Sequence, residues 1–159
     1  RAVLTDGGQD MVAVEQEIAQ QVRYLEIERM RFPDRLHYSV DIDPAAKGWS
    51  IPALIIQPLI ENAVKYGVSG TDRPVNINIS AHIEGDRLRI TIANDGRVQT
   101  GAGIAQDRTA GTGTGLINIQ DRLKALYGQN ASLLLANNKE GMATATVVLP
   151  DPSLIFQDI

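Results

Sequence analysis

An extended stretch of alternating apolar and polar residues, from position 75 to position 92, constrains the fold of this chain most strongly. The alternation is interrupted once, by Gly85-Asp86. Strict alternation is typical of strands with one buried face, and Gly-Asp between two such strands is typical of a tight hairpin turn. The sequence therefore predicts an antiparallel pair of strands. Its apolar positions are Val75, Ile77, Ile79, Ala81, Ile83, Leu88, Ile90 and Ile92.

The residues before this hairpin switch from helical to strand spacing. Apolar residues at helical spacing run from about Val14 to Arg31, and Pro33 ends the pattern. Such a narrow stripe packs either on its own domain or on a partner helix. Alternation over residues 36–42 then predicts a strand with one buried face. Residues 1–10 are small and polar, and we expect them to be loosely ordered or to be the frayed tail of an upstream element.

A central helix is expected to begin near Ser50, which is a suitable N-cap, and Pro58 is expected to bend it. After the hairpin come a glycine-rich stretch, a third helix and two strands at residues 132–135 and 143–149. This order predicts an α+β fold. In it, helices cover one face of a mixed, mostly antiparallel sheet.

Composition and charge limit the possible functions. The chain has 159 residues, of which 43% are hydrophobic, and this suffices for one domain with a core. A formal net charge of -4 offers no general attraction to nucleic acid or to an anionic membrane surface. The lack of cysteine excludes disulfides and thiolate chemistry. With no membrane-spanning run, signal peptide or initiator Met, the chain is expected to be a soluble piece of a longer protein.

A glycine-rich run is the first candidate for ligand binding. Glycine occupies every second position of Gly111-Thr112-Gly113-Thr114-Gly115-Leu116, directly before a segment with helical spacing. Backbone N–H groups at glycines approach an anion closely, and a helix N-terminus favours negative charge. The run therefore predicts a polyphosphate site. A plain loop that enters a helix has the same pattern.

A second candidate site lies on the central helix. The carbonyl oxygen of Asn62 can bind Mg²⁺ if phosphates and waters fill the other positions. Lys65 supplies a cation for phosphate, and Tyr66 supplies an aromatic face. In the alternative interpretation Asn62 bridges a neighbouring loop, Lys65 pairs with Glu61 at the four-residue spacing, and Tyr66 is a half-buried packing residue.

Together these segments resemble the GHKL ATPase superfamily, in the form found in LytS-type sensor histidine kinases. Residues 57–67, QPLIENAVKYG, are similar to its asparagine box, and Asn94-Asp95-Gly96 is similar to its first glycine box. The run from Gly111 to Leu116, followed by Asn118, Arg122-Leu123 and Tyr127-Gly128, resembles the second glycine box. The segment that joins the histidine-bearing helices to the ATP-binding domain is similar to Val14, Glu17-Ile18, residues 24–28 and Arg31-Phe32. The resemblance implies the two-layer GHKL (Bergerat) sandwich.

The resemblance also implies residue roles. Asn62 would hold Mg²⁺, Lys65 would contact the phosphates, and Tyr66 would pack near the base or sugar. The first two would be the catalytic residues, and residues 97–110 would form a mobile lid over the nucleotide. The glycine boxes imply further nucleotide-binding positions at Asn94, Asp95, Gly96, Gly111, Thr112, Gly113, Thr114, Gly115 and Leu116.

Two features depart from the wider family. Asn94 stands where the family has the aspartate that reads adenine, and an amide makes a weaker acceptor than a carboxylate. Pro58 stands where ATP-hydrolysing members have a glutamate that activates water, which disfavours hydrolysis. The phosphoacceptor histidine of LytS-type kinases lies in an upstream motif. His37 and His82 lack that context and are predicted to point outward from strands.

The predicted function is therefore the ATP-binding catalytic domain of a two-component sensor histidine kinase. It would use ATP and Mg²⁺ to transfer the γ-phosphoryl group to a histidine upstream of this chain. The alternatives are an ATPase clamp of the same superfamily and a degenerate dimer scaffold. The expected partners are the upstream dimerisation helices of a homodimer and a response regulator, with neither nucleic acid nor membrane contacted by this chain.

The resemblance divides the chain into three parts. Residues 1–33 are expected to be a linker and helix from the upstream dimerisation region, residues 34–150 the catalytic domain, and residues 151–159 a C-terminal tail. The domain is expected to be cytoplasmic, in a protein anchored in the inner membrane.

Overall fold

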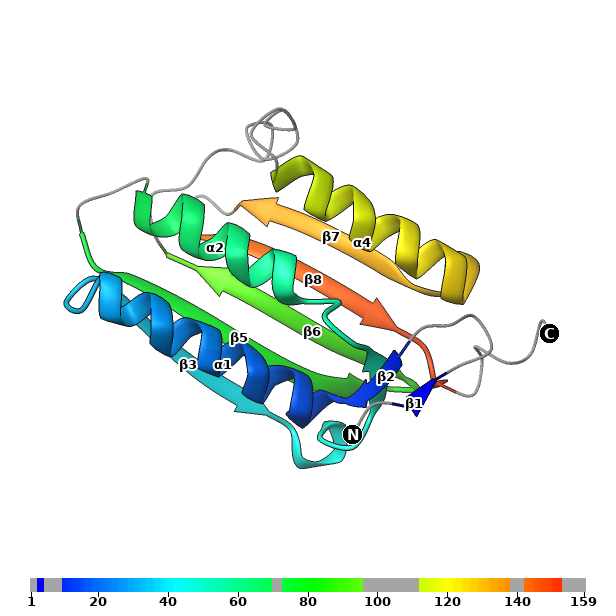
Figure 1. The fold of residues 1–159 in the computed structure, drawn as a ribbon. Coiled ribbons are helices and arrows are strands. Elements are labelled where there is room, and N and C mark those ends of the chain that lie inside the picture. Colours follow the sequence, from blue (N-terminus) through cyan, green and yellow to red (C-terminus); the bar gives the residue numbers. More distant parts are fainter. Residues whose placement is uncertain (1–2, 5–9, 70–72, 96–111, 138–141, 153–159) are drawn as a thin grey trace.

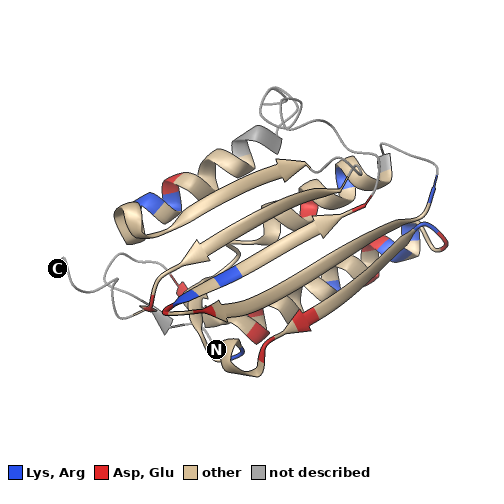
Figure 2. Ribbon diagram, turned by 180° about the vertical axis from the view of Figure 1, so that it is seen from behind, with Lys and Arg blue, Asp and Glu red and all other residues tan. Residues whose placement is uncertain are grey.

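A five-stranded sheet with helices on one face forms the body of the protein (Figure 1). In this computed structural model, α1 (Val14–Arg31), α2 (Gln57–Ser69) and α4 (Thr112–Tyr127) lie over the sheet. Seen from behind, the strands lie in front, and no described helix covers them (Figure 2). The predicted α+β sandwich is confirmed. The structure describes residues 3–4, 10–69, 73–95, 112–137 and 142–152.

The large sheet is mixed and mostly antiparallel, as predicted. Its strand order is β3-β5-β6-β8-β7, and only the β3–β5 pair among these described strands is parallel. The predicted hairpin is confirmed: Glu84 lies opposite Arg87, and Gly85 has a φ of 64°, a left-handed conformation that favours glycine. The strands are β3 (Leu36–Ile42), β5 (Val75–Glu84), β6 (Arg87–Asn94), β7 (Ser132–Asn137) and β8 (Ala143–Leu149).

A second, three-stranded sheet joins the N-terminal residues to the segment before α2. Its order is β1-β2-β4, with β1 (Val3–Leu4), β2 (Asp10–Ala13) and β4 (Ser50–Pro52) paired antiparallel. The expectation of loose order was therefore wrong for residues 3–4 and 10. Their backbone groups pair within a sheet whose third strand is distant in sequence. Two short 3₁₀ helices, η1 (Pro44–Ala46) and η3 (Gly128–Asn130), complete the described elements.

The central helix α2 begins at Gln57, and the prediction of a start near Ser50 was wrong. Ser50 instead pairs with Ala13 in the small sheet. Pro58 consequently becomes the second residue of α2, where a backbone N–H has no partner within the helix in any case. The predicted bend at Pro58 was also wrong, because proline removes no helical hydrogen bond at this position.

The core lies between the helices and the large sheet, and α1 contributes to it. Val14, Ile18 and Leu25 are at most 2% exposed and belong to the same buried cluster as residues of α2 and β5. Of the two alternatives for the α1 stripe, packing on its own domain is confirmed. The domain boundary after residue 33 stays a prediction. No helix among the described residues is long and apolar enough to cross a membrane.

Candidate functional site

A pocket opens between α2, the start of α4 and the strands β6, β7 and β8. It brings together four of the predicted site residues, namely Asn62, Tyr66, Asn94 and Leu116. The other walls are mostly apolar, which suits a flat organic ring with a few polar groups. The full lining is Leu59, Asn62, Ala63, Tyr66, Ile92, Asn94, Leu116, Leu135, Ala143, Thr144 and Ala145.

The spacing of residues on α2 explains which of them reach the pocket. Leu59, Asn62, Ala63 and Tyr66 follow one another at three- and four-residue intervals, so they share one face of the helix. Leu59 and Ala63 are buried, whereas Asn62 and Tyr66 are partly exposed. The helix therefore presents an apolar wall and two polar side chains to the same cavity.

Asn94 supplies a buried acceptor to the pocket wall. Asn94 is only 6% exposed, and its Oδ1 has no hydrogen-bond partner among the described residues. The lack of a side chain on Gly67 makes this placement possible, since a Cβ there would lie 3.2 Å from Asn94 Oδ1. A buried acceptor without a partner costs about 1–3 kcal/mol. A ligand that donates an N–H to Asn94 would remove this cost.

Asp95 lies outside this lining. Its Oδ1 accepts the backbone N–H of Asn76 at 2.7 Å, and its Oδ2 accepts a hydrogen bond from Asn76 Nδ2 at 2.9 Å. The alternation along β6 explains the difference, because Asn94 continues the buried phase of Ile90 and Ile92. Of the two neighbours, Asn94 faces the pocket and Asp95 fastens β6 to β5.

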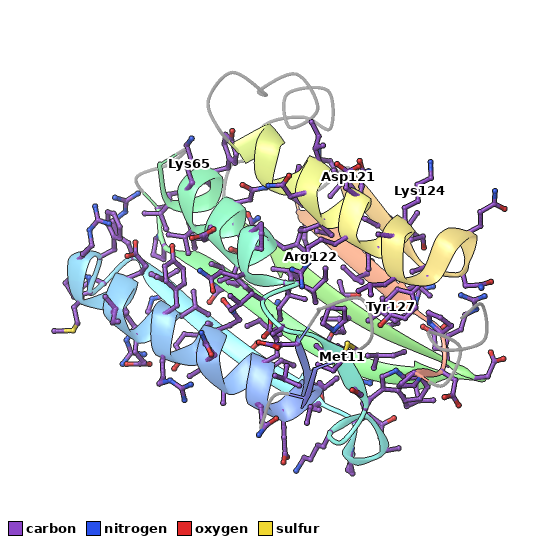
Figure 3. All side chains as sticks on the ribbon, turned by 45° about the vertical axis from the view of Figure 1, so that its right-hand side comes forward. Met11, Lys65, Asp121, Arg122, Lys124 and Tyr127 are labelled. Atoms are coloured by element: carbon purple, nitrogen blue, oxygen red, sulfur yellow. The ribbon has the colours of Figure 1, made fainter. Side chains whose placement is uncertain are left out.

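Lys65 lies on α2 beside the pocket and does not line it. Its Nζ lies 5.5 Å from the centre of the Tyr66 ring, and its side chain points away from the sheet (Figure 3). Lys65 also borders a groove between α1 and α2, which Tyr24 and Glu61 share. Burial, reinforced by Glu28 and Glu61, raises the pKa of Tyr24 to about 12. Lys65 is exposed on the side of α2 that borders this groove.

The glycine-rich run lies partly within α4. The helix already includes Thr112, Gly113 and Thr114, although the sequence predicted a loop up to about residue 116. Gly115 allows α4 to approach α2 closely, since a Cβ on Gly115 would lie only 3.2 Å from Pro58 Cβ. Gly96, Gly111 and the predicted lid at residues 97–110 lie outside the described residues.

Two charged residues to which the sequence analysis gave no role, Glu17 and Arg122, hold the segment before α2. Glu17 of α1 is 3% exposed, and its carboxylate accepts the backbone N–H groups of Leu54 at 2.9 Å and Ile56 at 3.4 Å. Arg122 Nη2 of α4 donates to the carbonyl oxygen of Ala53 at 2.8 Å. Burial raises the pKa of Glu17 and lowers that of Arg122, and the attraction between them opposes both shifts. The helical spacing of Glu17 from Val14 could have indicated its burial.

The sequence of the chain matches one protein family over most of its length. The sequence model of the histidine kinase-, DNA gyrase B- and HSP90-like ATPases matches residues 51–153. Sensor histidine kinase YesM of Bacillus subtilis is 32% identical over 141 residues, which are 89% of this chain and 24% of YesM. Sensor histidine kinase/phosphatase LytS of Staphylococcus aureus is 28% identical over 162 residues, with 94% of this chain and 27% of LytS covered. The chain thus spans about a quarter of the length of these relatives.

Solved structures show the same fold. The catalytic domain of histidine kinase ThkA superposes with a TM-score of 0.69 at 14% identity, over 89% of this chain and 96% of that domain. Histidine kinase AdeS of Acinetobacter baumannii gives a TM-score of 0.65 at 15% identity, over 89% of this chain and 66% of AdeS. The resemblance drawn from the three sequence boxes is confirmed, and the chain belongs to the histidine kinase-, DNA gyrase B- and HSP90-like ATPase family.

Proposed function

We propose that this chain is the ATP-binding catalytic domain of a sensor histidine kinase. It transfers the γ-phosphoryl group of ATP to a histidine on a helix upstream of residue 1. The observation that carries this proposal is the pocket in which Asn62, Tyr66 and the unpartnered acceptor of Asn94 meet. The names of the YesM and LytS relatives support the same function.

The residues of the pocket fit a nucleoside triphosphate. Asn94 Oδ1 accepts a hydrogen bond from the adenine amino group, whereas guanine presents a carbonyl oxygen at the equivalent position. Tyr66 packs against the base or sugar, and Lys65 neutralises phosphate charge. Asn62 would hold Mg²⁺ through its amide oxygen. Gly111, Gly113 and Gly115 wrap the triphosphate, and Gly96 is a further nucleotide-binding position.

Phosphoryl transfer needs positioning and charge neutralisation more than covalent help from the protein. Mg²⁺, when bound, supplies part of that neutralisation. Pro58 lies four residues before Asn62 and packs against Gly115, so this position offers no base to activate water. The chain therefore favours transfer to a separate acceptor over hydrolysis. The acceptor helices form a homodimer, a response regulator receives the phosphoryl group, and the domain acts in the cytoplasm.

Calorimetric titration with a non-hydrolysable ATP analogue and Mg²⁺ tests this proposal. We expect saturable binding that is weaker for the matching GTP analogue and weaker in Asn62→Ala. Asn78→Ala serves as the matched control, because Asn78 is an exposed asparagine on β5 outside the pocket. No heat with either nucleotide would identify the chain as a scaffold. Steady ATP hydrolysis that Asn62→Ala abolishes would identify an ATPase clamp instead.

A further inference from the structure

The four residues that lead into α2, residues 53–56, form an unusual segment that we call the entry segment. Leu54 has a φ of 62° although it is not glycine, and its side chain is 44% exposed. A left-handed leucine is strained and persists only where surrounding contacts fix it. The backbone N–H of Ala53 donates to the carbonyl oxygen of Asp10 at 2.9 Å, which fixes the start of the segment to β2.

Glu17 fixes the entry segment from the side of α1. Its carboxylate binds the N–H groups of Leu54 and Ile56, at the free N-terminal end of α2. Negative charge at such an end is favourable because it satisfies unpaired donors and complements the helix dipole. The cap of α2 is thus a side chain from another helix, 37 residues earlier in the sequence than Leu54.

Arg122 fixes the same segment from the side of α4. It projects from α4 toward the start of α2, whereas Lys124, two residues on, points away from the protein (Figure 3). Its hydrogen bond to the Ala53 carbonyl oxygen spans 69 residues of sequence. The same helix contributes Leu116 to the pocket, and its Gly115 packs against Pro58. Two helices therefore hold one short segment from opposite directions.

We propose that Glu17 and Arg122 are positioning residues for nucleotide binding. They set where α2 begins, and Leu59 and Asn62 lie within the two turns that follow. A displacement of α1 that breaks the hydrogen bonds of Glu17 to Leu54 and Ile56 would free the start of α2. The position of α1 and the occupancy of the pocket are consequently coupled, and the coupling acts in both directions. This inference rests on the proposed function.

The test compares Glu17→Gln with two control variants, one on the same helix and one that weakens the core. Glu15→Gln changes an exposed glutamate on the same helix, and Ile90→Val weakens the core away from the pocket lining. We expect Glu17→Gln to weaken binding of the Mg²⁺-ATP analogue about five- to tenfold, the size of a modest coupling between sites. Both control variants should bind within about twofold of the unaltered chain.

A second measurement follows the entry segment directly. In the unaltered chain, the analogue should slow hydrogen exchange at the amides of Leu54 and Ile56, and Glu17→Gln should speed it. If Glu17→Gln does not fold, Arg122→Lys replaces it, with Lys124→Gln as its exposed control. Lysine keeps the charge but lacks the planar guanidinium group whose Nη2 donates to Ala53, so we expect the same direction of effect.

The outcomes separate this inference from the proposed function. An unaltered chain that binds no nucleotide overturns the proposed function. A chain that binds nucleotide, while Glu17→Gln binds equally well, overturns the positioning role alone. Equal losses of affinity in Glu17→Gln and Ile90→Val would show that general stability controls binding, which also overturns the positioning role.

Discussion

Asn94 places an uncharged, buried acceptor in the wall of the pocket. We expect Asn94→Asp to bind the ATP analogue about fivefold more tightly, since hydrogen bonds to a charged acceptor are stronger by about 1 kcal/mol. The same change should lower the melting temperature without nucleotide, because a carboxylate is costlier to bury than an amide. Calorimetry and thermal unfolding measure the two effects.

The control for this substitution is Asn78→Asp, at an exposed position of β5. It should change neither affinity nor melting temperature appreciably. Unchanged affinity in Asn94→Asp would contradict a hydrogen bond between residue 94 and the adenine base. A lower melting temperature without a change in affinity would show only that residue 94 is buried.

Glu17 makes stability depend on pH in a defined direction. Burial raises its pKa above the ordinary value of 4.5, so the folded state holds this proton more tightly than the unfolded state does. Its contribution is fully present below pH 4.5 and is lost as pH rises through the raised pKa. Urea unfolding measures the free energy of unfolding of the unaltered chain and of Glu17→Gln. As pH rises, the unaltered chain should lose stability relative to Glu17→Gln. A shift in the opposite direction would contradict the raised pKa.

At the scale of single elements, α1 carries a second buried polar residue one turn after Glu17. Gln21 is fully buried, and neither its Nε2 nor its Oε1 has a hydrogen-bond partner among the described residues. We expect Gln21→Leu to raise the free energy of unfolding by about 1–3 kcal/mol, the cost of leaving such groups unsatisfied. Chemical denaturation measures this change.

Gln20 offers the matched control, because it is exposed on the same helix. Gln20→Leu should change the free energy of unfolding by less than about 0.5 kcal/mol. A loss of stability in Gln21→Leu would indicate that the buried amide is hydrogen-bonded through water.

The elements that could be predicted from sequence are those whose partners lie nearby in the chain. The β5–β6 hairpin carries its alternation and its turn within twenty residues, and α1 carries a stripe that Pro33 ends. The start of α2 could not be placed in this way. Ser50 and Pro52 have the local features of a helix start, but β2, from a distant part of the sequence, draws them into a strand.

The same distinction applies to the candidate site. Asn62 and Tyr66 share a helix face, and their common direction follows from their spacing. Glu17 and Arg122 bind backbone groups that lie 37 and 69 residues away in the sequence. Local sequence patterns do not indicate the partners of such long-range contacts. The buried position of Asn94 was available from the alternation of β6.

At the scale of the whole molecule, the chain should bind ATP without phosphorylating itself. His37 and His82 lie on the polar phase of β3 and β5, on the face of the sheet away from the helices and the pocket, and His82 Nε2 lies 3.5 Å from Asp41 Oδ2. Incubation with ATP labelled at the γ-phosphate should leave no acid-labile label on this chain. A longer protein that includes the upstream helices should become labelled.

The two histidines provide the control for this experiment. His37→Ala and His82→Ala should leave nucleotide binding unchanged. Label on the unaltered chain that disappears in either variant would place the acceptor on the sheet and contradict transfer to an upstream helix.

The small sheet has a mechanical consequence. β2 runs without a break into α1, and its ladder to β4 joins Met11 to Pro52 and Ala13 to Ser50. Tension along β2 loads these transverse hydrogen bonds in shear, so they share the force and do not open one at a time. A pull at residue 10 therefore acts both on α1 and, through β4, on the segment that leads into the helix carrying Asn62.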